Sequence, residues 1–374
     1  MNLRRANFVR ETRSATAKRR HLRWWPPARA GAFRLVVAAI FALCPTVWSA
    51  EVDRDLSAYG EIVTQYRAGD VTGAVQVVES WRRERLLQAA VRLWQLKEGA
   101  RASRGWSTTA IAGACLLHLE VMDRHPDQPF RQALHMQILR KHLAMLRVDG
   151  AAPLAATLSL ALALSLQGQL KIEDLRSLFD ELGETDVSDG PLLLARGTMY
   201  ELLASRRLEA ARDARLVPGA KESLQEAERF LRRCLAVASR TIEARLRLAH
   251  VVIVQGRPEE GIALLEPPLP ESNEAEARYL ADLFLGQAYA LAGRSESAAK
   301  AFSAAAAQSP CGQAAAVALA HLAFREQRFA AAREVLDPVL RRPAGCTDPW
   351  AVYDFGQAAR LPGLIDELRR AVQP

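Results

Sequence analysis

Apolar positions along most of this chain recur every three to four residues, which is the spacing of one face of an α-helix. The segment 279–310 shows this pattern most clearly. Its small and apolar residues form two stripes, one on each side of a glycine, and a proline follows the second stripe: Leu285, Gly286, Tyr289, Gly293, Ala298, Phe302, Ala305 and Pro310. Because Pro310 cannot continue a helix, the second stripe ends there. The segment therefore predicts two helices joined by a turn at Gly293.

The same plan is repeated on both sides of this segment. The residues 34 positions further on are Leu319, Ala320, Ala323, Ala332, Leu336 and Val339. Upstream the spacing is 37 rather than 34, because the loop 267–273 holds three extra residues, and the matching positions are Leu248, Ala249, Val252, Gly256, Gly261 and Leu265. One helical hairpin cannot bury its apolar face alone, so a series of such units predicts a stack.

In these positions the chain resembles the tetratricopeptide repeat (TPR) family, of an exported bacterial type. The resemblance is strongest over 241–346 and weakens upstream, and Asp282 stands where the family most often has Trp. It implies an all-α fold, namely an α-solenoid of antiparallel helix pairs in a right-handed superhelix. It also implies a scaffold for protein–protein interaction. Ala, Leu, Arg and Glu dominate the composition, and these residues favour helices.

The pattern predicts four regions along the chain. They are a signal peptide over 1–50, degenerate helical repeats over 51–183, TPR-like repeats over 191–346 and C-terminal capping helices over 347–374. The repeats are clearest over 279–312 and 313–346, and a break is expected near 184–190. A solenoid needs a polar outer helix at its end, and Leu361–Val372 fits that role.

The net charge of +8 is concentrated at the start of the chain. Residues 1–50 hold ten basic residues and one acidic residue, which leaves 40 basic and 41 acidic residues for the rest. A basic flank followed by the apolar run Leu35–Val47 and small residues predicts a secretory signal peptide cleaved near 49 or 50. We therefore expect a periplasmic or secreted protein. The alternative is an uncleaved helix that anchors the protein to the inner membrane, and the true translation start remains open.

The resemblance also implies where a partner binds, because the first helices of TPR units line a concave groove. The ninth place of three adjacent first helices holds His250, Gln287 and His321, and another groove place holds Leu283 and Val317. This mixture of apolar and hydrogen-bonding groups predicts that a peptide or helix of a protein partner lies along the groove. The alternative is that His250 and His321 pack within the stack. The near-neutral charge after residue 50 does not favour a nucleic-acid partner.

No catalytic or nucleotide-binding motif is present, so we expect neither an enzyme nor a bound cofactor. The weak metal candidates are His118, His125, His135 and His142, which form two pairs seven positions apart. Seven residues separate two side chains by about 10 Å along a helix, too far for one pair to share a metal ion. A metal-binding or small-molecule-binding helical protein that uses this region is the less favoured alternative.

The cysteines that follow the predicted leader bear on the compartment. Cys311 and Cys346 lie 35 positions apart, at the ends of adjacent predicted units. An oxidising compartment would allow a disulfide between them, but the sequence does not decide whether it forms. Cys115 and Cys234 are expected to be small core residues.

Overall fold

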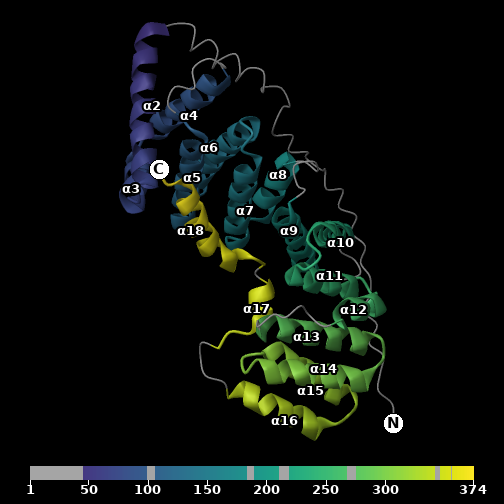
Figure 1. Ribbon diagram of the computed structural model, residues 1–374. Coiled ribbons are helices and arrows are strands. Elements are labelled where there is room, and N and C mark those ends of the chain that lie inside the picture. Colours follow the sequence, from purple (N-terminus) through teal and green to yellow (C-terminus); the bar gives the residue numbers. More distant parts are fainter. Residues whose placement is uncertain are drawn as a thin grey trace, which may run out of the picture. The chain divides into compact units, whose positions relative to one another are not determined.

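A computed structural model describes residues 45–98, 106–182, 189–209, 219–267, 275–341, 346–354 and 356–374 (Figure 1). The predicted all-α fold class is confirmed, because every regular element in these ranges is helical. The chain divides into two compact units, Met1–Asp53 and Arg54–Pro374. Most of the predicted signal peptide, and most of the expected break near 184–190, lie outside the described residues.

The first half of the described chain contains seven helices. They are α2 (Pro45–Arg67), α3 (Val71–Ser80), α4 (Arg83–Glu98), α5 (Thr108–Arg124), α6 (Pro129–Val148), α7 (Ala152–Gly168) and α8 (Ile172–Leu182). Side-chain caps define where two of them begin. Asp70 accepts a hydrogen bond from Gly73 N at 2.9 Å, and Ser107 accepts one from Ala110 N at 3.1 Å. Each cap satisfies a backbone N–H that has no partner inside its helix.

The second half continues with eight helices that pack against their neighbours in sequence. They are α9 (Gly190–Glu209), α10 (Ala220–Val237), α11 (Ile242–Val254), α12 (Pro258–Leu265), α13 (Ala275–Leu291), α14 (Ser295–Gln308), α15 (Gln313–Arg325) and α16 (Phe329–Leu340). Helices α9 and α10, α11 and α12, α13 and α14, and α15 and α16 form contacting pairs. The first helices of the last three pairs, α11, α13 and α15, also contact one another in turn.

The α13–α14 pair depends on a close approach at Gly286. A Cβ atom placed on Gly286 would lie 2.5 Å from Cδ1 of Phe302, so only glycine leaves room for this ring. Phe302 is buried together with Ala298 and Ala305 on the same face of α14. Gly293 makes the turn between the helices with φ +76°, and Pro310 follows two residues after the end of α14. Leu285 and Tyr289 are half-buried beside this core.

The turn after α15 has the same left-handed backbone without a glycine. Gly256 and Gly293 have φ of +81° and +76°, and Gln327 takes the equivalent place with φ +58°. Leu170, after α7, also has a positive φ of +57°. A residue with a Cβ atom is strained in this conformation. Glycine in place of Gln327 or Leu170 would relieve this strain.

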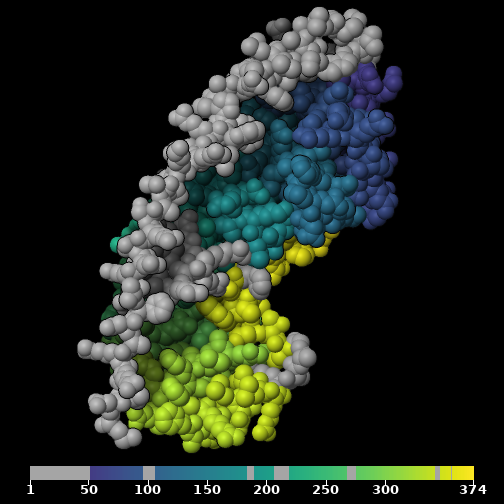
Figure 2. All heavy atoms as spheres, turned by 180° about the vertical axis from the view of Figure 1, so that it is seen from behind, coloured from purple at the N-terminus to yellow at the C-terminus, as the bar shows by residue number. Residues whose placement is uncertain are grey.

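After α16 the chain turns back along its earlier helices through three short elements. These are α17 (Pro349–Asp354), the 3₁₀ helix η2 (Ala358–Arg360) and α18 (Leu361–Val372). Helix α17 contacts α13, η2 contacts α7, and α18 contacts both α5 and α7. In Figure 1 the yellow α18 lies beside the blue α5 and α7, and in Figure 2 yellow atoms lie against both the blue and the green parts of the chain. We refer to 346–372 as the return segment.

The sequence predicted capping helices over 347–374, and the return segment places the helix α18 of this region against α5 and α7. The apolar stripe of α18, made of Leu361, Ile365, Leu368 and Val372, is buried in the same core as α5 and α7. Two polar contacts hold it there. Arg67 donates to the carbonyl oxygen of Val372 at 2.6 Å, and Arg369 forms an ion pair with Glu120 at 2.9 Å. The sequence suggested only a polar outer helix over 361–372 and did not reveal which helices bury its apolar stripe.

None of the helices in the described ranges combines the length and the apolar character that crossing a bilayer requires.

Candidate binding surface

The five residues that the sequence placed in a groove lie on three adjacent helices. His250 is on α11, Leu283 and Gln287 are on α13, and Val317 and His321 are on α15. The return segment divides this set. It covers His250 and Leu283. Gln287 is half-buried, and the two residues of α15 are exposed.

His250 is enclosed by aromatic rings and an acidic side chain. Its ring centroid lies 4.8 Å from that of Phe284, 5.3 Å from that of Trp350 and 5.6 Å from that of Tyr353. Its Nδ1 atom lies 2.8 Å from Oε1 of Glu201, and only 11% of the side chain is exposed. The sequence left open whether His250 contacts a ligand or packs within the fold, and here it packs against α17.

Leu283 is buried in the same cluster as Tyr353. Sequence reasoning did not single out Trp350 and Tyr353, the α17 residues that cover this part of the predicted groove. Their spacing was an available signal, because two aromatic residues three positions apart lie on one face of a helix. What the sequence did not show is that this face docks on α11 and α13.

Beneath α17 lies a buried ion-pair network centred on Arg247. Its guanidinium lies 2.8 Å from Oε2 of Glu201 and 3.0 Å from Oε1 of Glu243, and it donates to the carbonyl oxygen of Tyr353 at 3.3 Å. Tyr353 also donates a hydrogen bond from its hydroxyl to Glu201. The two contacts of Tyr353 join α17 to helices more than one hundred positions earlier in the chain.

The charges of this network stabilise one another. Burial alone would raise the pKa of Glu201, but Arg247, His250 and Tyr353 outweigh it and lower that pKa. Burial would likewise lower the pKa of Arg247, but Glu201 outweighs it and raises that pKa. Burial, reinforced by the nearby Glu201 carboxylate, raises the pKa of Tyr353 well above its ordinary value. The network therefore holds a charged pair and a neutral phenol at neutral pH.

The return segment is fastened at its start by a carboxylate and a disulfide. Asp348 accepts hydrogen bonds from Ala314 N at 2.6 Å and from the hydroxyl of Tyr279 at 3.0 Å. Ala314 lies in the first turn of α15, where backbone N–H groups lack partners inside the helix. Cys311 and Cys346 form a disulfide with their Cα atoms 5.4 Å apart. The sequence had left this bond open.

A cluster of four exposed residues lies on and beside α15, at the end of the helical array. Val317 and Phe324 are 51% and 59% exposed, and His321 between them is also exposed. These three residues are spaced i, i+4 and i+7, so they share one face of α15. Phe329 is also exposed, and its ring lies 5.3 Å from that of Phe324. We call Val317, His321, Phe324 and Phe329 the α15 surface.

Three of the four candidate histidines come together in the core of the first half. Nδ1 of His118 lies 2.7 Å from Nδ1 of His135. The hydroxyl of Tyr59 lies 2.7 Å from Nε2 of His118 and 3.2 Å from Nε2 of His142. His125 lies outside this chain of hydrogen bonds, with Nε2 at 2.6 Å from Oε1 of Glu79. Sequence reasoning missed Tyr59, which links the histidines.

These three histidines are neutral because they are buried. Burial lowers the pKa of His142 to about 4. Burial and the nearby charge of Arg131 and His125 lower the pKa of His135 to about 4. Burial and the two neighbouring imidazoles also lower the pKa of His118. His118 bonds to His135 and to Tyr59, and Tyr59 also bonds to Nε2 of His142, whereas Nδ1 of His142 has no hydrogen-bond partner. Among the described residues no group of histidine, cysteine or acidic side chains has an arrangement that would hold a metal ion.

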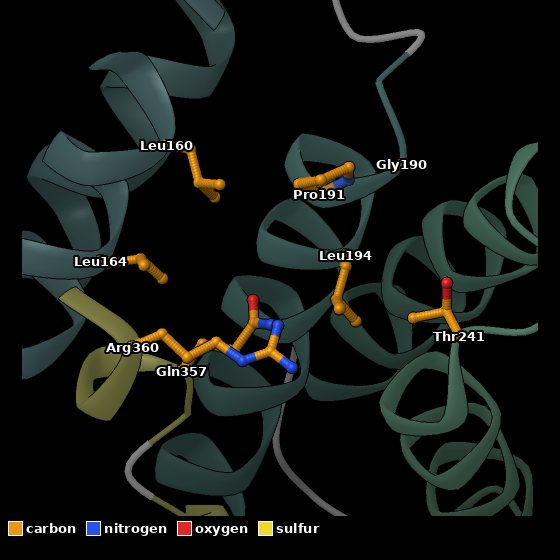
Figure 3. A pocket seen from close by; sticks show the side chains of 8 residues that line it. All are labelled: Leu160, Leu164, Gly190, Pro191, Leu194, Thr241, Gln357 and Arg360. Atoms are coloured by element: carbon orange, nitrogen blue, oxygen red, sulfur yellow. The ribbon is translucent and has the colours of Figure 1, made fainter. Parts of the chain in front are cut away.

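A small pocket lies where α7, α9, α11 and η2 meet (Figure 3). Its volume is about 110 Å³, and its lining residues are Leu160, Leu164, Gly190, Pro191, Leu194, Thr241, Gln357 and Arg360. Its two long polar side chains both bond to Glu243, although Oε1 of Gln357 is buried without a partner. Gln357 donates to Glu243 at 3.0 Å, and Arg360 forms an ion pair with the same carboxylate at 3.2 Å. The pocket therefore resembles a packing gap more than a ligand site.

Comparison with known proteins returned no relatives for this chain: no protein-family model and no curated protein matches it. The resemblance to the TPR family therefore rests on the repeat residues alone.

Proposed function

We propose that this protein is a TPR-like α-solenoid scaffold that binds a peptide or helix of a partner protein on its α15 surface. One observation carries the proposal. Val317, His321 and Phe324 present an exposed, largely apolar face, while the equivalent face of α13 is covered by α17. An exposed apolar stripe on a helix is the kind of surface that an amphipathic partner helix buries.

The proposal involves no chemical step and no cofactor. The buried histidines and the buried carboxylates bond to residues of the same chain, so their arrangement serves folding. The charge after residue 50 is close to neutral, which favours a protein partner over nucleic acid. Compared with the sequence-based groove, the proposed site loses His250 and Leu283 and keeps Val317 and His321, with Gln287 at its edge.

We also propose that the protein is exported to the periplasm or secreted. Two features support this: the basic and apolar character of 1–50, and the disulfide between Cys311 and Cys346. Disulfides persist in oxidising compartments and are rare in the cytosol. The alternative is an adaptor held at the inner membrane by an uncleaved Leu35–Val47 helix. N-terminal sequencing of the mature protein distinguishes the two, because export with cleavage predicts a start near residue 50.

Site-specific photo-crosslinking tests the binding proposal directly. A photoreactive amino acid replaces Val317 in the full chain, and a second protein carries it at Lys300, an exposed position on α14. We expect a discrete crosslinked partner from position 317 and none from position 300.

Two substitutions on the α15 surface are matched by two control substitutions at exposed apolar residues of α6. The controls show whether loss of any exposed apolar side chain weakens binding. In proteins without the photoreactive residue, Val317→Asp and Phe324→Ala should abolish co-purification of the partner that crosslinking identifies. Val148→Asp and Phe130→Ala, which alter side chains that are 88% and 87% exposed on α6, should leave capture unchanged. Equal capture by all four variants, with helicity intact, would show that the partner does not bind on α15.

A further inference from the structure

The geometry points to the kind of partner that the α15 surface takes, and this inference rests on the proposed function. We propose that the partner segment is a short helix with two aromatic side chains one turn apart and an acidic residue beside them. The chain's own α17 is such a segment, and it docks on α11 and α13, the first helices directly before α15.

Helix α17 shows how the array binds aromatic residues. Trp350 packs edge-on against His250 and Phe284, with ring centroids 5.3 and 5.8 Å apart. Tyr353 also packs against both rings, at 5.6 and 5.2 Å. Edge-to-face aromatic pairs at these separations are favourable beyond the area that they bury. The inner faces of the first helices are therefore suited to aromatic side chains.

The same repeat places similar groups on α15. His321 occupies the place that His250 has in its own unit, since the units are offset by 37 and then 34 positions. Val317 likewise corresponds to Leu283. Phe324 lies one turn beyond His321 and adds the ring that a second aromatic helix can pack against. The α17 interface thus continues onto α15, where no part of the described chain covers it.

The charges near this surface favour an acidic segment. Asp348 precedes α17 by one residue and accepts a hydrogen bond from the first turn of α15. At the other end of α15, Arg325 is exposed next to Phe324, and Arg328 follows it. Arg328 is already paired with Glu326 at 2.5 Å, so Arg325 is the cation that a partner's carboxylate would meet first.

A synthetic peptide tests this inference on the intact protein. The probe is the segment Thr347–Asp354 with blocked ends and a fluorescent label, measured by fluorescence polarisation. Its matched control carries the changes Trp350→Ala and Tyr353→Ala. We expect saturable binding of the first peptide to the native chain, and binding at least ten-fold weaker for the control.

The binding position is tested with variants of the protein. Val317→Asp, Phe324→Ala and His321→Ala should each weaken binding of the aromatic peptide at least ten-fold. Val148→Asp and Phe130→Ala should not change it. Circular dichroism verifies that each variant is as helical as the native chain, and the three independent substitutions keep the test decisive if one of them perturbs folding.

Three results would overturn the inference. They are an absence of saturable binding, equal binding of the alanine peptide, and binding that is insensitive to the α15 variants but lost with Phe284→Ala. The last result would mean that the peptide replaces α17 instead of docking beside it. If a partner still crosslinks from position 317 in any of these cases, the proposed function stands and only the aromatic chemistry of the partner is wrong. If neither probe reaches α15, both proposals fail.

Discussion

Tyr353 on α17 donates a hydrogen bond to Glu201 on α9, although 152 positions separate the two residues. The bond closes a network in which the buried Glu201 carboxylate also faces Arg247 and His250. The return segment therefore completes the polar interior of helices that fold far upstream of it.

Glu201→Gln should destabilise the protein strongly, because it leaves the guanidinium of Arg247 buried with Glu243 as its remaining acidic partner. Breaking a buried ion pair by removing one member costs about 3–5 kcal/mol. Tyr353→Phe removes one hydrogen bond to a charged group and should cost about 1.5–3 kcal/mol. Urea unfolding followed by circular dichroism measures both losses. Glu296→Gln, which breaks an exposed pair with Lys300, should have almost no effect.

Gly286→Ala should destabilise the α13–α14 pair by about 1–3 kcal/mol, because the new methyl group overlaps the ring of Phe302. The double variant Gly286→Ala/Phe302→Leu should recover part of the loss if the overlap is the cause. Gly363→Ala on α18 serves as the control, since nothing lies within 4 Å of its added Cβ atom. Thermal unfolding ranks the three proteins, and equal melting temperatures for Gly286→Ala and the native chain would contradict the close approach.

Gln327→Gly and Leu170→Gly should each stabilise the protein by about 0.5–1 kcal/mol. Both residues have left-handed backbones, with φ near +58° and +57°, where a Cβ atom is strained. The relief is partly offset by the greater freedom of glycine in the unfolded chain. Gly293→Ala, at the equivalent turn with φ +76°, should have the opposite sign. A stabilising Gly293→Ala would show that the turn tolerates side chains.

The free energy of unfolding should fall as the pH drops from about 6.5 to about 4. In this window the unfolded chain protonates its histidines at their ordinary pKa, whereas His135 and His142 in the folded protein have pKa values of about 4. Each of these two histidines therefore lowers the free energy of unfolding by about 1.4 kcal/mol for every unit by which the pH drops within this window. Above pH 6.5 the folded and unfolded states are both neutral at these positions, and this contribution vanishes.

Urea titrations between pH 7.5 and pH 4.5 measure this slope. His142→Gln should reduce it, and His321→Gln, at an exposed position, should not. Glu201 also has a lowered pKa, but its contribution is lost mainly below pH 4.5, the ordinary value for a glutamate. A stability that is constant across the window would contradict the buried, neutral state of the histidines.

Removal of the disulfide by Cys311→Ser/Cys346→Ser should cost about 3–4 kcal/mol, as expected for a closed loop that spans 35 positions. A reductant should lower the stability of the native protein toward that of the variant and leave the variant unchanged. Cys115 and Cys234 are free and buried, so they should react with thiol reagents only after unfolding. Unaltered stability under reduction would indicate that the bond does not constrain the chain.

The sequence predicted those features of the fold that depend on neighbouring residues. Helical spacing, the turn at Gly293 and the small residue at Gly286 are all encoded within one unit, and repetition every 34 or 37 positions made them recognisable.

What escaped prediction depends on residues that are distant in sequence. Nothing near Trp350 or Tyr353 indicates that their partners are His250 and Glu201, so the covering of the predicted groove became apparent only in three dimensions. The same holds for Tyr59, which lies 59 and 83 positions from the histidines that it joins. Helix periodicity reveals that a face is buried, whereas the partner is chosen by packing across the whole chain.

The return of α18 to α5 also bears on how the protein comes apart. In an open row of repeats each unit touches only its neighbours, so the outermost unit can melt while the rest stays folded. Here α18, which follows the last pair, is packed into the core formed with α5 and α7, and the disulfide joins the residues on either side of the α15–α16 pair. Local unfolding of the C-terminal end would therefore also disrupt the core around α5 and α7. The molecule should accordingly lose its structure in a single cooperative step rather than unit by unit.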